Sequence, residues 1–190
     1  TVRLATALLA LAVALPALAA RIALAMKGWE PVGELAMAEL RLRGFWGDPP
    51  DLGAVARIRV GDQNAAHPGP LAYWLLYPVY ALLGRGSAGL AVAVGAVAAG
   101  WAAASVVLVA RRVGAAAAAI LAGALLLLLG GLGSEVLSQP WNPWMGIVAC
   151  AFLVLATWDT VAGHPWSLVG VAFAGSVCVQ THFSYVPLTA

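Results

Sequence analysis

Long apolar runs constrain this chain more than any other feature of its sequence. A helix that crosses a bilayer needs about 20 mostly apolar residues. Five stretches meet or approach that length, namely residues 4–26, 88–110, 114–133, 143–162 and 166–181. Only 9% of the residues are charged and 63% are hydrophobic, which leaves too few charges to cover a water-soluble domain. The sequence therefore predicts one all-α domain over residues 1–190, a polytopic transmembrane helix bundle whose external loop carries short juxtamembrane helices.

A sixth apolar stretch, residues 70–84, is too short to cross a bilayer comfortably. It contains Pro70 and Pro78, which limit regular helical hydrogen bonding. It is also rich in tyrosine and tryptophan, which gather at membrane interfaces. We therefore predict that residues 70–84 form a helix that lies along the membrane interface.

Positive charge predicts the orientation of the bundle. Arg111 and Arg112 separate two apolar runs, and cytoplasmic loops are enriched in such residues. Arg3 lies on the same side if the first apolar stretch is a retained helix, although its pattern is also typical of a cleaved signal peptide. With the helix retained, residues 27–69 form an external loop. These features predict an integral protein of the plasma (inner) membrane.

The external loop concentrates the charge of the chain. Eleven of the eighteen Asp, Glu, Lys and Arg residues lie between Lys27 and Asp62. Among them, Glu34 and Glu39 follow the first apolar stretch closely. A carboxylate beside apolar groups can act as a general base or bind a metal ion. The alternative is that both are ordinary solvated acids.

Two Arg-x-Arg pairs lie in the same loop and consist of Arg41, Arg43, Arg57 and Arg59. Guanidinium groups are suited to bidentate recognition of phosphate. Contact with lipid headgroups and simple solubility are the alternatives. The net charge of +2 is too small to indicate a nucleic-acid partner.

Three polar segments mark predicted helix ends on the external side. They are His67-Pro68-Gly69-Pro70, Trp141-Asn142-Pro143-Trp144 and Gln180-Thr181-His182-Phe183-Ser184. Polar groups at membrane depth are costly and are often functional. Interfacial anchoring, helix initiation and hydrogen bonding between helices are the alternatives. The two cysteines lie in apolar runs, and they indicate neither a disulfide framework nor a metal site.

These segments resemble the polytopic membrane glycosyltransferases of the GT-C class, and most closely the actinobacterial members described as mannosyl- or arabinosyltransferase-like. The similarity covers all 190 residues. Such proteins commonly read Gly-Asp-x-Ala-x-x-Glu-Leu-Arg after the first helix, and residues 33–41 occupy that place, with Glu34 where the family usually carries Asp. Residues 67–84 match strongly, and Trp141-Asn142-Pro143 and the Gln180-x-His182 pair are familiar in the same subgroup.

The resemblance implies transfer of a sugar from a polyprenyl-phosphate-linked donor to an acceptor on the outer face of the membrane. It implies catalytic roles for Glu34 and Glu39. The residues predicted to bind the donor are Arg41, Arg43, His67, Tyr73, Asn142, Gln180 and His182. A divalent metal ion serves some members, and Glu34 would be its ligand here. Known members have more helices, so we expect this chain to be the N-terminal part of a longer architecture whose partners include the lipid-linked donor and membrane lipid.

Two other functions fit the same sequence. A multi-span transporter or flippase component for lipid-linked precursors could use the external acids as a proton or cation site. A non-catalytic assembly subunit could carry Glu34 as a vestige. Transporters usually place ionisable groups near the bilayer midplane. Because the acids here lie outside the apolar stretches, the sequence favours the enzyme.

Overall fold

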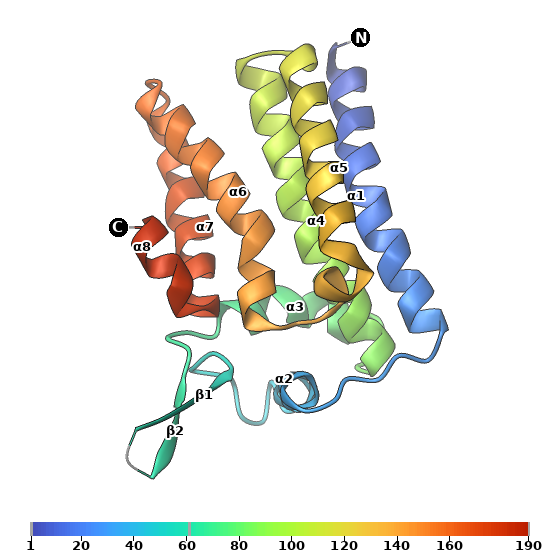
Figure 1. The fold of residues 1–190 in the computed structure, drawn as a ribbon, viewed down its shortest axis with the longest axis vertical. Helices are drawn as coiled ribbons and strands as arrows, with labels where there is room; N and C mark the ends of the chain where they lie inside the picture. The colour runs from blue at the N-terminus through green and yellow to red at the C-terminus, as the bar shows by residue number, and fades with distance from the viewer. Residues whose placement is uncertain (1, 61, 190) are drawn as a thin grey trace.

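The protein is a polytopic all-α bundle (Figure 1). This computed structural model describes residues 2–60 and 62–189, without the side chains of residues 2, 56–60, 63, 134–138 and 142. Four helices are long and apolar enough to cross a membrane: α1 (Val2–Met26), α4 (Ser87–Arg112), α5 (Ala115–Ser138) and α6 (Asn142–Val161). This confirms the predicted helical bundle, and the chain is an integral membrane protein.

The fifth predicted helix is shorter than the other four. It forms α7 (Leu168–Thr181), preceded by the 3-10 turn η1 (Pro165–Ser167), and its 14 residues rise only about 21 Å. Pro165 opens the turn, and the extended backbone of His182 ends the helix. The turn η2 (Phe183–Tyr185) and the short helix α8 (Val186–Thr189) follow. Helix α7 packs against α6 and does not reach the length of a full span alone.

The bundle is built around α4, which packs against α1, α3, α5 and α6. One core cluster fills the space between the long helices, with Val13, Trp101, Val106, Leu125 and Val148 among its buried members. A second cluster joins α2, α3 and α4 at one end, through Leu42, Phe45, Leu76, Tyr80 and Leu90. The second cluster fixes the loop segment against the bundle.

Arg21 lies inside the bundle near the end of α1. A cation there could extend to the membrane interface, but its side chain is 0% exposed. It packs on Gly95 of α4, where an added Cβ would overlap the Cγ of Arg21 and lie 3.3 Å from the carbonyl oxygen of Ala17. The absence of a side chain at residue 95 therefore lets α1 and α4 approach around the arginine.

We expect Gly95→Ala to destabilise the protein by about 1–3 kcal/mol, the usual cost of overpacking. Gly100→Ala is the matched control, because a Cβ at residue 100 of the same helix would meet no atom within 4 Å. Thermal unfolding in detergent, followed by size-exclusion chromatography, measures both. Equal melting temperatures for the two variants would contradict the tight contact between α1 and α4.

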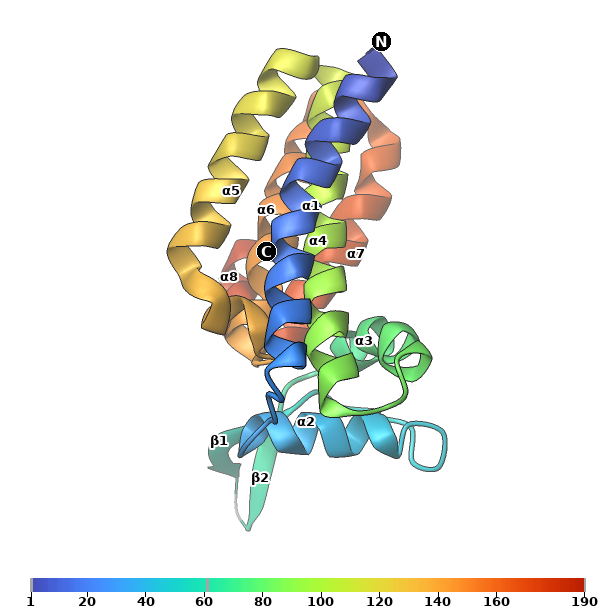
Figure 2. The ribbon, with the colours of Figure 1, turned by 90° about the vertical axis from the view of Figure 1, so that its right-hand side faces the viewer.

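The loop between α1 and α4 lies at one end of the bundle (Figures 1 and 2). It contains α2 (Glu34–Arg43) and the strands β1 (Val55–Val60) and β2 (Gln63–Ala66). The strands form a two-stranded antiparallel hairpin in which Val55 pairs with Ala66 and Arg59 with Asn64. Short helices were predicted for this loop, whereas the hairpin was not predicted.

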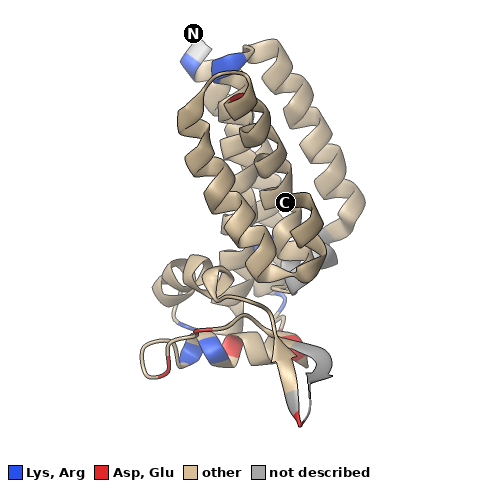
Figure 3. Cartoon of the chain, turned by 90° about the vertical axis from the view of Figure 1, so that its left-hand side faces the viewer, with Lys and Arg blue, Asp and Glu red and all other residues tan. Residues whose placement is uncertain are grey.

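Helix α3 (Leu71–Leu82) lies at the same end and not along the bundle. Figure 2 shows it beside the first turns of α4, next to α2. The start of α6 and the turn after α7 also come to this end, which we call the loop end (Figure 1). The last turn of α4, which carries Arg111 and Arg112, lies with the N-terminus at the opposite end (Figure 1). Charged residues gather at the two ends of the molecule (Figure 3).

Candidate functional site at the loop end of the bundle

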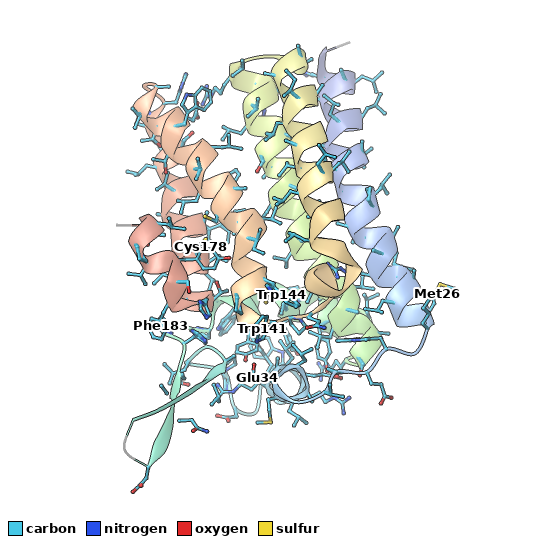
Figure 4. All side chains as sticks on the ribbon, in the orientation of Figure 1. Met26, Glu34, Trp141, Trp144, Cys178 and Phe183 are labelled. Atoms are coloured by element: carbon cyan, nitrogen blue, oxygen red, sulfur yellow. The ribbon has the colours of Figure 1, made fainter. Side chains whose placement is uncertain are left out.

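Glu34 is the first residue of α2 and faces the ends of the long helices. Ala38 and Leu42 follow it at intervals of four residues, so the three share one helix face. Both are buried in the cluster with α3. That burial turns Glu34 towards the start of α6, where the indole Nε1 of Trp141 donates a hydrogen bond of 2.9 Å to its Oε2 (Figure 4).

Trp141 is held by the first turn of α6. Its carbonyl oxygen accepts hydrogen bonds from the backbone N–H groups of Trp144 at 3.0 Å and Met145 at 3.1 Å. Its ring packs edge-to-face on Trp144, with the centroids 4.7 Å apart and the planes at 85°. The indole that meets Glu34 is therefore positioned by a membrane-spanning helix and not by the loop.

His67 is buried at the loop end, with 6% of its surface exposed. Its backbone exchanges two 3.0 Å hydrogen bonds with Gly53 and Ala54. A Cβ at residue 53 would lie 2.8 Å from the Cβ of His67, so glycine permits this close approach. Burial chiefly, together with the neighbouring His182, lowers the pKa of His67, and the charge of Glu34 opposes that shift. His67 is therefore a neutral imidazole at physiological pH.

His182 and Phe183 lie against His67. The centroid of the His67 ring is 5.0 Å from that of His182 and 5.4 Å from that of Phe183. His182 comes at the end of α7, and its Nδ1 accepts a 3.1 Å hydrogen bond from the N–H of Ser184. The structure thus brings His67 and His182 into contact, and Glu34 lies near enough for its charge to act on His67. All three are predicted site residues, and they come from distant parts of the sequence.

Gln180 connects α7 to the start of α3. Its Oε1 accepts a 3.1 Å hydrogen bond from the backbone N–H of Leu71. The side chain also packs on Gly69, where any Cβ would overlap it. The amide oxygen of this predicted donor-binding residue therefore holds the entry to α3.

Glu39 lies in different surroundings from Glu34. It is 3% exposed and faces α3 and α4. Its carboxylate pairs with Arg43 at 2.7 Å, accepts a 2.9 Å hydrogen bond from Ser87, and lies 3.4 Å from the hydroxyl of Tyr80. The bond to Glu39 raises the pKa of Arg43. Glu39 therefore fastens α2 to its neighbours, and the two predicted catalytic acids do not share a site.

Arg41 and Tyr73 lie between α2 and α3. Arg41 donates a long hydrogen bond of 3.4 Å to the carbonyl oxygen of Leu52. Tyr73 is buried, and burial raises its pKa while the charge of Arg41 lowers it. A cavity of about 320 Å³ adjoins Arg41 on the outer face of α2, with Asp48 and Asp51 in its wall. The side chains of Asn142, Arg57 and Arg59 lie outside the described residues, so their predicted roles remain predictions.

The described residues do not form a ready metal site. Among them, no three His, Cys, Asp or Glu side chains lie close enough to hold an ion. Glu34 meets an indole donor, and Nδ1 of His182 is already an acceptor for the N–H of Ser184. No step of the chemistry proposed below passes through a metal ion.

Two polar contacts were missed by reasoning from the sequence. The indole of Trp141 was part of a recognised motif, but nothing in the sequence pairs it with Glu34. Asp159, at the far end of α6, is 0% exposed and pairs with Arg112 at 2.9 Å and His164 at 3.0 Å. A single acid inside an apolar run was a signal that could have identified Asp159.

Comparison with known proteins finds no relative of this chain. No family model matches the chain, and neither a curated protein nor a solved structure matches it. The function is therefore inferred from the geometry of its own residues.

Proposed function

We propose that this protein is a membrane glycosyltransferase that moves a sugar from a polyprenyl-phosphate-linked donor to an acceptor hydroxyl. One observation carries the proposal: the carboxylate of Glu34 is fixed by Trp141 at the loop end of a membrane bundle, where its charge acts on His67. A donor whose prenyl chain lies in the bilayer would present its phosphate and sugar at this level. The resemblance described above supports the same chemistry.

In this reaction the acceptor hydroxyl attacks the anomeric carbon of the sugar. The bond from that carbon to the donor phosphate oxygen breaks, and the phosphate keeps the bonding electrons. Glu34 takes the proton from the hydroxyl as the general base. The departing phosphate needs a positive or hydrogen-bonding neighbour more than it needs an acid.

Arg41 is better suited than Arg43 to receive that phosphate. Arg43 is already paired with Glu39 at 2.7 Å, whereas the contact of Arg41 with the carbonyl of Leu52 is long and neutral. His67 is neutral at physiological pH, so its role here would be a hydrogen bond and not a positive charge. Among the described spanning residues, Arg21 and Asp159 lie near helix ends, and neither forms the midplane ion site that a transporter would use.

Transfer of a radiolabelled sugar tests the proposal. Membranes that express the full-length gene are supplied with polyprenyl-phosphate mannose or polyprenyl-phosphate arabinose, and the label in non-donor material is counted. We expect transfer above that of empty-vector membranes with at least one donor. Counts no higher than those of empty-vector membranes, with each of the two donors, would overturn the proposal.

We further propose that the loop end faces outward from the plasma (inner) membrane and that Arg111-Arg112 faces the cytoplasm. The basis is the accumulation of arginine beside the turn between α4 and α5. Asp51→Cys and Val113→Cys, each in a chain with Cys150→Ala and Cys178→Ala, place single thiols at exposed positions of the two ends. Val113 is chosen because its neighbour Gly114 has a φ of 114°, which a cysteine would strain.

An impermeant maleimide should label intact cells only at residue 51. Cells opened with detergent should label at both positions, which controls for the accessibility of each thiol. Labelling of intact cells only at residue 113 would invert the topology and remove the outer-face reaction.

A further inference from the structure

We propose that Trp141 is the positioning residue for Glu34, setting the direction of its carboxylate and keeping it in the ionised form. This inference rests on the proposed function, because it assigns a partner to the proposed base. It adds a residue from the junction of α5 and α6 to a site that otherwise belongs to the loop and to α7. Glu34 and Trp141 are 107 positions apart in the chain.

The chemistry of the indole makes the contact directional. An indole N–H only donates, and it has no lone pair with which to accept a bond from a protonated acid. A carboxylate accepts such a bond, and a charged acceptor makes it short and strong. At 2.9 Å the bond from Nε1 of Trp141 therefore favours the ionised Glu34, the form that a general base needs before the acceptor hydroxyl arrives.

The frame behind the indole makes the contact rigid. The carbonyl of Trp141 accepts hydrogen bonds from Trp144 and Met145, which are helix bonds of the first turn of α6. The Trp144 ring packs edge-to-face on the Trp141 ring and limits its rotation. Glu34 begins a ten-residue helix outside the bundle, so this bond ties its direction to a membrane-spanning helix. Misplacement of a catalytic group by about 1 Å can cost about 100-fold in rate.

Trp141→Phe tests the inference, because it removes the N–H and keeps an aromatic ring. Trp158→Phe is the matched control: it makes the same change at an exposed tryptophan near the other end of α6. The assay is transfer from polyprenyl-phosphate mannose or arabinose by purified full-length protein, with kcat and the donor KM measured separately. We expect Trp141→Phe to lower kcat about 10- to 100-fold and to leave KM within about twofold, because the base does not bind the donor. We expect Trp158→Phe to stay within about threefold of the original kcat.

Glu34→Asp provides a second route that leaves α6 unchanged. The shorter side chain withdraws the carboxylate from the indole, so kcat should fall and the further change Trp141→Phe should add little. Multiplying effects of the two substitutions would mean that Trp141 acts elsewhere, and the inference would be overturned. Should Trp141→Phe yield too little folded protein, this comparison is made with Trp141→Leu, whose side chain has no hydrogen-bond donor.

The outcomes separate the inference from the function on which it rests. Loss of transfer in Glu34→Gln with unchanged kcat in Trp141→Phe would overturn the positioning role and retain Glu34 as the base. Unchanged transfer in Glu34→Gln would overturn Glu34 as the base, and the positioning role would be lost with it. Loss of transfer in both variants, with Trp158→Phe active, supports both the function and the positioning role.

Discussion

Replacing Glu34 by glutamine should lower the rate of sugar transfer by about 10²- to 10⁴-fold, the usual contribution of a general base. Glutamine keeps the size of the side chain and can still accept the hydrogen bond from Trp141. It cannot take the proton of the acceptor hydroxyl. The measurement is the initial rate of transfer from the polyprenyl-phosphate donor, divided by the amount of folded protein that elutes as a single size-exclusion peak.

Glu30→Gln is the control for that experiment. Glu30 lies four residues earlier in the same loop, is exposed, and borders the cavity beside Glu39. Its replacement changes the net charge equally but leaves the proposed base in place. A normal rate in Glu34→Gln, or an equal loss in Glu30→Gln, would rule out the assigned role.

Glu39→Gln should lower the thermal stability of the protein more than it lowers the rate of sugar transfer. Its carboxylate is held by Arg43 and Ser87, beside the Tyr80 hydroxyl, in a place that Glu34 does not reach. A neutral amide loses the ion pair with Arg43, and one of its two polar atoms no longer accepts hydrogen bonds. We expect a lower melting temperature and, at temperatures where the variant is folded, a rate within about tenfold of the original. A rate as low as that of Glu34→Gln, in protein of normal stability, would return Glu39 to the catalytic residues.

The long helices were predictable because their signal is local. A run of about 20 apolar residues satisfies its own backbone hydrogen bonds only as a helix in a bilayer, so α1, α4, α5 and α6 could be located from composition alone. The length of α7 was less predictable. Its apolar run continues to the polar patch, but Pro165 and His182 divert the backbone at each end and leave 14 helical residues.

The hairpin was missed although its signal is present. Residues 55–60 alternate small or apolar side chains with arginine at 57 and 59, and Gly61-Asp62 follows as a turn signal. The arginine pairs were interpreted as phosphate ligands, and the alternation of side chains was not used to predict a strand. Strand pairing between Val55 and Ala66 then shapes the approach to His67, which follows β2 directly.

The candidate site could be predicted only in part, because its contacts join distant segments. The sequence identified Glu34, His67 and His182 by residue type and by position at helix ends, and the structure places them together. It could not separate Glu34 from Glu39, since that depends on which face of α2 is buried. Ala38 and Leu42 decide it by packing on α3, so Glu34 turns towards α6. Nor could it pair Trp141 with Glu34, which requires the start of α6 to meet the start of α2.

Replacing Asp159 by alanine should have the largest effect on stability among the substitutions considered, although Asp159 lies at the opposite end from the candidate site. Its carboxylate joins three elements: the end of α4 through Arg112, the turn after α6 through His164, and η1 through the hydroxyl of Ser167. Removing one member of a buried charged cluster leaves its partners without compensation, which costs far more than breaking an exposed pair.

We expect Asp159→Ala to lower the melting temperature in detergent by on the order of 5–10 °C. The helices α6 and α7 should detach from α4 first, because Asp159 links them to Arg112. Arg111→Ala is the control: Arg111 is exposed, adjoins Arg112, and makes no ion pair within the part of the chain that the structure describes. A melting temperature of Asp159→Ala within about 2 °C of that of Arg111→Ala would show that the cluster contributes no more than a surface pair.

The same variant also reports on the site, because α6 carries Trp141 at its other end. Loosening of α6 should lower transfer in Asp159→Ala below the melting temperature, while Arg111→Ala keeps the original rate.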